Sequence, residues 1–245
     1  MNFKDCIDSY PFILMEGALG ERLKREFDLD ISGTVAMADL IYQQKGRMAL
    51  KTLWNEYMDI AHRYQLPFLA TTPTRRANKE RVYMAGYNES IITDNVDFLR
   101  TIKETANVNM YIGGLMGCKG DAYTSERALN QEEAIAFHSW QASLFKSVGV
   151  DFLYAGIMPV LSEAIGMAVA MSDTDIPYII SFTIQRNGKL IDGHTINDAI
   201  YYIDNHVSNK PVCYMTNCVH PDIVYEALSH KFNQTQMVKN RFWGI

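Results

Sequence analysis

The chain has 245 residues, with 23 Lys and Arg against 28 Asp and Glu, so its formal net charge is −5 and its sequence pI is near 5.7. Hydrophobic residues make up 48% and charged residues 21%, which is ordinary globular usage and excludes a disordered chain. Because the chain is acidic and has no run of Lys or Arg, we expect neither nucleic acid nor a membrane as its main partner.

The cysteines and the N-terminal residues indicate in which cellular compartment the protein is expected. The four cysteines, Cys6, Cys118, Cys213 and Cys218, form no CxxC pair and no framework spacing, which favours a reducing, cytoplasmic setting. The mixed charge of the first six residues does not resemble a secretory signal. No Pro/Gly/Ser-rich linker divides the sequence, so we expect one domain over residues 1–245.

Short apolar runs bounded by Gly, Pro or Asn recur along the chain, as buried parallel strands do. They predict strands at Pro11–Met15, Leu66–Thr71, Val108–Leu115, Val150–Ile157, Ile176–Ile184, Pro211–Thr216 and Phe242–Ile245.

Helical patterns lie between these runs. In Met48–Tyr64 the apolar residues recur three or four apart, which predicts one buried stripe of a helix. Asn130 with Glu133, and Thr195 with Asp198, resemble capping boxes that begin two further helices. Pro221 suits the first turn of another.

Alternating strands and helices predict a parallel sheet, either doubly wound or closed into a (β/α)8 TIM barrel, and we favour the barrel. A barrel needs eight strands, whereas this sequence supplies six complete βα units and the start of a seventh strand. We therefore expect a barrel that is incomplete at the C-terminus, as in a fragment of a longer chain.

In a barrel, working residues lie at the C-terminal ends of the strands. Glu16 follows the first predicted strand, where its carboxylate could bind an ammonium group or could interact with the dipole of the next helix. Thr71, Thr72 and Asn217 also lie at strand ends, and they could orient a small polar substrate or cap the helices that follow.

Cys218 lies between the sixth strand and the next helix, near the positive end of the helix dipole, which favours a thiolate. It could be a nucleophile, a zinc ligand or simply a small buried residue. His220 could be a second ligand, but we favour hydrogen bonding at the helix start. The glycine-rich stretch from Gly113 lacks the spacing of a phosphate-binding loop, and we interpret it as tight-turn geometry.

Together these strand-end motifs resemble the homocysteine S-methyltransferase family over nearly the whole chain. The resemblance rests on Glu16-Gly17-Ala18-Leu19-Gly20 followed by Glu21, Ala70-Thr71-Thr72-Pro73-Thr74, Gly149-Val150-Asp151 through Pro159 and Glu163-Ala164, Ser181-Phe182-Thr183 with Gly188, Asp192 and Gly193, and Thr216-Asn217-Cys218-Val219-His220-Pro221.

The resemblance implies a zinc-dependent methyltransferase that moves a methyl group from a small activated donor to a homocysteine-type thiol, giving methionine. By resemblance Cys218 is a zinc ligand, and Glu16 holds the substrate amine with Thr71, Thr72 and Asn217 nearby. The partners it implies are a small-molecule thiol acceptor and a methyl donor, and no oligomeric state follows from the sequence.

The sequence departs from the family pattern in two ways. The other two zinc ligands belong to a G-G-C-C-G motif that these 245 residues do not contain, so zinc is expected in the full-length parent while the site here is incomplete. The family's Glu and Thr after the fourth strand align with Gly156 and Ile157. The alternative functions are a non-catalytic relative that binds small molecules and a barrel enzyme that uses Cys218 directly as a nucleophile.

Overall fold

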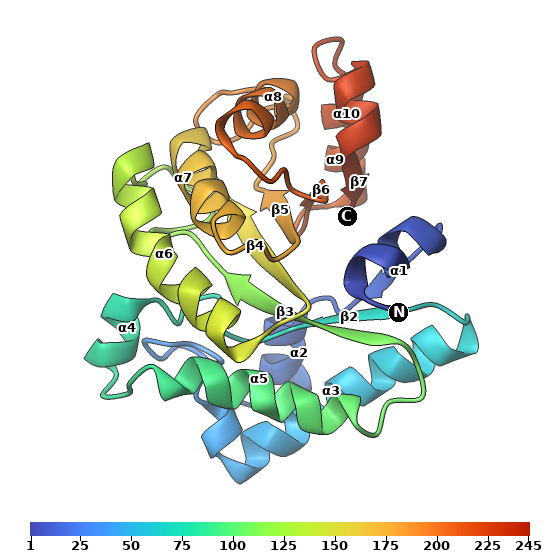
Figure 1. Cartoon of the computed structure of the whole chain (residues 1–245), viewed down its shortest axis with the longest axis vertical. Helices are drawn as coiled ribbons and strands as arrows, with labels where there is room; N and C mark the ends of the chain where they lie inside the picture. The colour runs from blue at the N-terminus through green and yellow to red at the C-terminus, as the bar shows by residue number, and fades with distance from the viewer. The chain divides into compact units, whose positions relative to one another are not determined.

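The computed structural model describes residues 1–245, and strands alternate with helices along the whole chain (Figure 1). The strands are β1 (Leu14–Met15), β2 (Phe68–Thr71), β3 (Met110–Met116), β4 (Phe152–Met158), β5 (Tyr178–Phe182), β6 (Cys213–Thr216) and β7 (Phe242–Gly244). All seven predicted strands are therefore confirmed, each within its predicted range or within one residue of it.

The helices fill the intervals between the strands. They are α1 (Phe3–Ser9), α2 (Leu19–Phe27), the short 3₁₀ helix η1 (Leu40–Tyr42), α3 (Gln44–Arg63), α4 (Lys79–Met84), α5 (Ser90–Lys103), α6 (Gln131–Val148), α7 (Leu161–Ser172), α8 (Ile196–His206), α9 (Pro221–Ser229) and α10 (Gln236–Arg241). None of these helices combines the length and the apolar character that crossing a membrane requires.

The chain divides into two compact units. The first contains Met1–Leu115 with Leu144–Phe152, and the second contains Met116–Ser143 with Leu153–Ile245. In the first unit β1 pairs with β2 and β2 with β3, all parallel. In the second, β4, β5, β6 and β7 pair in that order, also parallel. Within each unit the strands thus follow one another in chain order, as in consecutive βα units.

The capping signals in the sequence mark real helix starts. The Asn130 side chain accepts from the Glu133 N–H at 2.9 Å, while the Glu133 carboxylate accepts from the Asn130 N–H at 3.1 Å. Thr195 and Asp198 form the same reciprocal pair at the start of α8. Pro221 occupies the first turn of α9, where its missing N–H costs no hydrogen bond.

The paired glycines in β3 correct the turn interpretation made from sequence. Gly113 and Gly114 lie inside a strand rather than in a loop, and neither has a positive φ. A Cβ on Gly113 would stand 2.4 Å from the Phe152 ring, and one on Gly114 would stand 2.6 Å from the Phe145 ring. These positions therefore need glycine because two aromatic rings pack against the strand.

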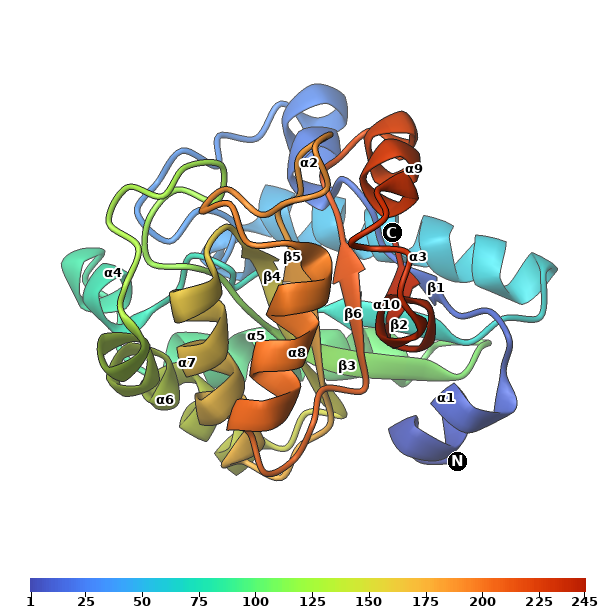
Figure 2. The same cartoon turned by 90° about the horizontal axis from the view of Figure 1, so that it is seen from above.

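In the second unit, α7 and α8 lie side by side, and α7 packs on β5 (Figures 1 and 2). Ten of the twelve residues of α7 are buried, which is typical of a helix covered on all sides. At Gly166 an added Cβ would stand 2.4 Å from the Ala134 Cβ. Helices α6 and α7 therefore approach closely at this point.

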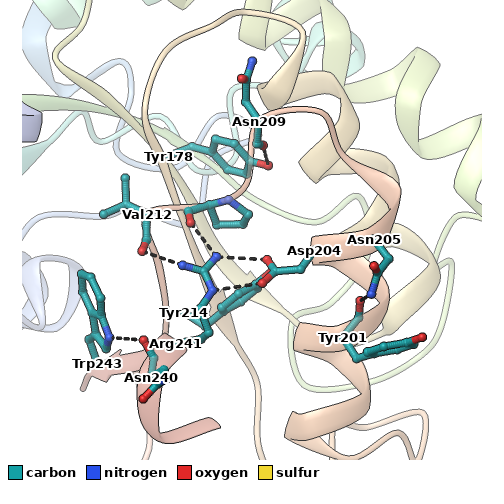
Figure 3. Close-up of polar contacts among 11 residues, drawn as sticks. Tyr178, Tyr201, Asp204, Asn205, Asn209, Val212, Tyr214, Asn240, Arg241 and Trp243 are labelled. Carbon is teal, nitrogen blue, oxygen red and sulfur yellow. Dashed lines mark hydrogen bonds and ion pairs between the residues drawn. The ribbon is translucent and has the colours of Figure 1, made fainter. Parts of the chain in front are cut away.

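An ion pair fixes the last helix and strand to the second unit (Figure 3). The Arg241 guanidinium donates to both carboxylate oxygens of Asp204, each at 3.0 Å, and to the carbonyls of Pro211 and Val212 at 2.7 and 3.1 Å. The Tyr214 hydroxyl donates to Asp204 at 2.8 Å. Because α8, the entry to β6 and the end of α10 all meet here, this pair holds β7 against β6.

Candidate functional site

The predicted site residues lie where the parallel strands end, in two groups. Glu16 directly follows β1, while Thr71 is the last residue of β2 and Thr72 follows it; these belong to the first unit. Asn217 and Cys218 directly follow β6 in the second unit. Both groups therefore occupy the C-terminal ends of strands, where barrel enzymes place their working residues.

The Glu16 carboxylate has one satisfied oxygen and one unsatisfied oxygen. Its Oε1 accepts hydrogen bonds from the Thr71 backbone N–H at 2.7 Å and from the Thr71 hydroxyl at 2.6 Å. Its Oε2 is buried and has no hydrogen-bond partner. Burial raises the pKa of Glu16 to about 7, although the hydrogen bonds from Thr71 partly offset the shift. Buried polar atoms are normally paired, so Oε2 marks a position for a hydrogen-bond donor.

This geometry decides part of the role of Glu16. The hydrogen-bond donors to its carboxylate come from β2, and helix α2 begins after Ala18 without a side-chain cap. Thr71 thus orients Glu16 rather than capping a following helix. The raised pKa also makes a cationic partner favourable, since a nearby positive charge stabilises the ionised carboxylate.

The Thr72 side chain is hydrogen-bonded within the protein interior. It is fully buried, its Oγ1 lies 2.7 Å from the Thr74 Oγ1, and it accepts from the Leu115 N–H at 3.1 Å. Thr74 in turn donates to the Leu115 carbonyl at 2.8 Å. The two hydroxyls join the end of β2 to β3, and contact of Thr72 with substrate stays a prediction.

Asn217 is the centre of a polar group in the second unit. Its Oδ1 accepts hydrogen bonds from the Tyr154 hydroxyl of β4 at 3.2 Å and from the Ser181 hydroxyl of β5 at 2.5 Å. Its Nδ2 donates to the Cys218 Sγ at 3.3 Å. Two hydroxyl donors on one oxygen fix the orientation of the amide, so that the NH2 group faces the sulfur.

Cys218 is exposed and is a free thiol, so the alternative of a small buried residue is wrong. Its φ of 57° lies in the left-handed region, which non-glycine residues adopt rarely. His220 caps helix α9, because its Nδ1 accepts from the Asp222 N–H at 3.2 Å. This is the hydrogen-bonding role that we favoured for His220 over metal ligation.

The residues of this chain do not by themselves fit a zinc ion. Zinc sites in proteins use at least three protein ligands, and structural sites use four. No group of three or more His, Cys, Asp or Glu side chains in the structure could hold a metal ion. Cys6 and Cys213 are buried, as expected for structural cysteines, and the Cys118 thiol donates to the Gly120 carbonyl. Cys218 is thus a single candidate ligand.

A second buried carboxylate was not identified as a site residue from the sequence. Glu163, in the first turn of α7, is fully buried and lies 3.1 Å from the Nε2 of His138, which is also buried. Burial lowers the pKa of His138, while the neighbouring Glu163 carboxylate opposes the shift. Glu163 occurred in one of the motifs, but neither its burial nor its pairing with His138 could be inferred from spacing.

Comparison with known proteins identifies the family. A model of the homocysteine S-methyltransferase family matches residues 13–241. The chain belongs to the homocysteine S-methyltransferase family. This confirms the resemblance that the strand-end motifs indicated. One curated relative, the homocysteine S-methyltransferase YbgG of Bacillus subtilis (strain 168), is 21% identical over 217 residues, which cover 82% of this chain and 67% of that protein.

Solved structures of the homocysteine methyltransferase MmuM from Escherichia coli share the fold of this family member. The metallated form matches with a TM-score of 0.77 at 18% identity, over 98% of this chain and 93% of that chain. The oxidised form matches with a TM-score of 0.73 at 19% identity, over 92% of this chain and 80% of that chain. The predicted fold class, an incomplete (β/α)8 barrel, is therefore confirmed.

Proposed function

We propose that this chain is an S-methyltransferase that moves a methyl group from a small activated donor to the thiol of a homocysteine-type amino acid. With homocysteine as acceptor the product is methionine. In the transfer, a bond forms between sulfur and the methyl carbon, the bond between that carbon and the donor breaks, and the thiol proton is released. Membership of the family supports the reaction class, and the geometry at Glu16 supports an amino acid as the acceptor.

The observation that carries the proposal is the buried, unpartnered Oε2 of Glu16. The ammonium group of an amino acid would supply the missing donor and a positive charge in one contact. Hydrogen bonds between charged groups are stronger than those between neutral groups, and a low local dielectric strengthens them further. Thr71 would hold the carboxylate in place through its two hydrogen bonds.

Asn217 and Cys218 supply a polar group at the ends of the strands in the second unit. We propose that Asn217 helps to bind the substrate and that Cys218 is the one zinc ligand these residues provide. Because a single thiol does not make a zinc site, the roles proposed here for the chain's own residues are to bind and orient the acceptor.

The second candidate function is a relative that binds the amino acid without transferring a methyl group. The lone candidate ligand Cys218 favours it, as do Gly156 and Ile157 at the positions where the family has Glu and Thr. The cysteines are all free, which supports the proposed cytoplasmic setting for either function.

The test is methionine formation by the 245-residue protein supplied with homocysteine, with S-methylmethionine, betaine and methylcobalamin as donors in parallel assays, each run with and without added Zn²⁺. We expect at least one donor to give methionine. Glu16→Gln is expected to lower kcat/KM at least tenfold, because it removes one charge-assisted contact of about 1.5–3 kcal/mol.

Glu21→Gln is the matched control, since Glu21 is an exposed carboxylate at the start of α2 that pairs with Lys24. It should retain the activity of the unmodified protein. Binding of homocysteine without methionine formation from any donor would favour the second candidate function. Full activity in Glu16→Gln would contradict the proposed role of Glu16.

A further inference from the structure

Glu163 receives hydrogen-bond donors from three directions in the interior of the second unit. Its Oε1 accepts from the Lys119 backbone N–H at 2.7 Å and lies 3.1 Å from the His138 Nε2. Its Oε2 accepts a longer bond, at 3.4 Å, from the Leu129 N–H. The side chain has no exposed surface. A buried carboxylate is costly unless such donors surround it, so these contacts determine its position.

Two of these donors come from the opposite ends of one loop. Lys119 and Leu129 lie near the start and the end of the segment 117–129, which follows β3 and precedes α6. Ser162, one residue before Glu163, donates from its hydroxyl to the Leu129 carbonyl at 2.9 Å. The first turn of α7 therefore binds both ends of this loop.

The middle of the same loop is tied to a strand end. The Thr183 hydroxyl, directly after β5, donates to the Ala122 carbonyl at 2.6 Å. Thr183 lies two residues beyond Ser181, whose hydroxyl binds the Asn217 side chain. A short path of hydrogen bonds and chain thus connects the 117–129 loop with the polar group around Asn217 and Cys218.

We propose that Glu163 is a positioning residue that holds the 117–129 loop against the C-terminal end of β5. The loop, held in one conformation, then borders the place where substrate binds. The inference rests on the proposed function for the location of the substrate. Glu163 is buried and touches no reacting group; it acts through the loop. A loop that is ordered before binding does not have to be ordered by the substrate, so its ordering lowers KM rather than raising kcat.

The test combines hydrogen exchange with kinetics on the 245-residue protein. In Glu163→Gln the amide NH2 replaces the acceptor that faces Leu129, so we expect amides of 117–129 to exchange about tenfold faster than in the unmodified protein. The KM of at least one substrate should rise about fivefold or more while kcat stays within about twofold. Thr183→Val is nearly isosteric and removes only the contact with Ala122. It should also speed amide exchange in 117–129 and raise KM, but by smaller factors than Glu163→Gln.

Ser139→Ala is the control, because the hydroxyl that it removes donates to the Ile135 carbonyl within α6 and not to the loop. Its exchange and kinetics should match those of the unmodified protein. Unchanged exchange of 117–129 in both Glu163→Gln and Thr183→Val would overturn the proposal, and so would faster exchange with neither KM altered. If the unmodified protein forms no methionine, the proposed function fails, and the exchange rates alone then decide whether Glu163 holds the loop.

Discussion

Replacing Glu16 with glutamine is expected to raise the free energy of unfolding at pH 8 by up to about 3 kcal/mol. The increase at pH 5 is expected to be much smaller. The folded-state pKa of Glu16 is about 7, against 4.5 for the ordinary group. Between these values the unfolded chain has released the proton while the folded chain retains it, so the free energy of unfolding falls as the pH rises through this window. Each pKa unit is worth about 1.4 kcal/mol.

Urea unfolding of both proteins at pH 5 and pH 8 measures this effect. The difference in unfolding free energy between Glu16→Gln and the unmodified protein should widen by roughly 2–3 kcal/mol across that range. Glu21→Gln provides a control of opposite sign, because the hydrogen bond and charge of Lys24 lower the pKa of Glu21, so any stability it contributes is present at high pH and is lost on acidification. A pH-independent difference for Glu16→Gln would mean that its carboxyl group titrates normally.

Arg241→Leu is expected to destabilise the protein by about 3 kcal/mol. The substitution removes both contacts to Asp204 and leaves that carboxylate, only 11% exposed, with the hydrogen bond from the Tyr214 hydroxyl (Figure 3). Breaking a buried ion pair from one side costs several kcal/mol because the remaining charge stays desolvated. The carbonyls of Pro211 and Val212 also lose a donor.

The midpoint of urea unfolding and the amide exchange of 236–244 measure the loss. Arg186→Leu is the matched control, since the pair between Arg186 and Glu226 is exposed on both sides and such pairs contribute about 0–1 kcal/mol. Adding Asp204→Asn to Arg241→Leu should recover part of the stability, because the desolvated charge is then gone. Equal effects of Arg241→Leu and Arg186→Leu would show that Asp204 does not depend on Arg241.

Signals that are local in the sequence predicted most of the fold. The reciprocal caps at Asn130 and Thr195 depend on residues three apart, and both helices begin where they indicate. The strands were predicted too long, as at Pro11–Met15, where only Leu14–Met15 is paired. Apolar runs show burial but not the extent of pairing. Gly113 and Gly114 were misinterpreted because the rings that require them lie about 30 to 40 residues further along the chain.

The candidate site was predictable only in part, for the same reason. The positions of Glu16 and Asn217 follow from the strand ends, which local patterns reveal. Their hydrogen-bond partners do not follow from local patterns. Tyr154 donates to Asn217 from 63 residues away in the sequence, and Thr71 donates to Glu16 from 55 residues away. The unpartnered Oε2 of Glu16 depends on packing, which spacing does not encode. The sequence motif contained Glu163, but the role of this residue could be inferred only from its contacts in the folded chain.

Calorimetric titration of the protein with methionine tests the central claim most directly. Methionine carries the ammonium group and has no thiol proton to release, and titration at pH 6.5 in buffers of different ionisation enthalpy counts the protons released. A carboxyl group with a pKa of about 7 is roughly three-quarters protonated at this pH, so binding the ammonium should release about that fraction of a proton. Titration of Glu16→Gln with methionine should not release this proton. Titration of the unmodified protein with the methionine analogue that lacks the amino group should not release it either. Release that is absent from the unmodified protein, or that persists in Glu16→Gln, would contradict the role of Glu16 as the ammonium receptor.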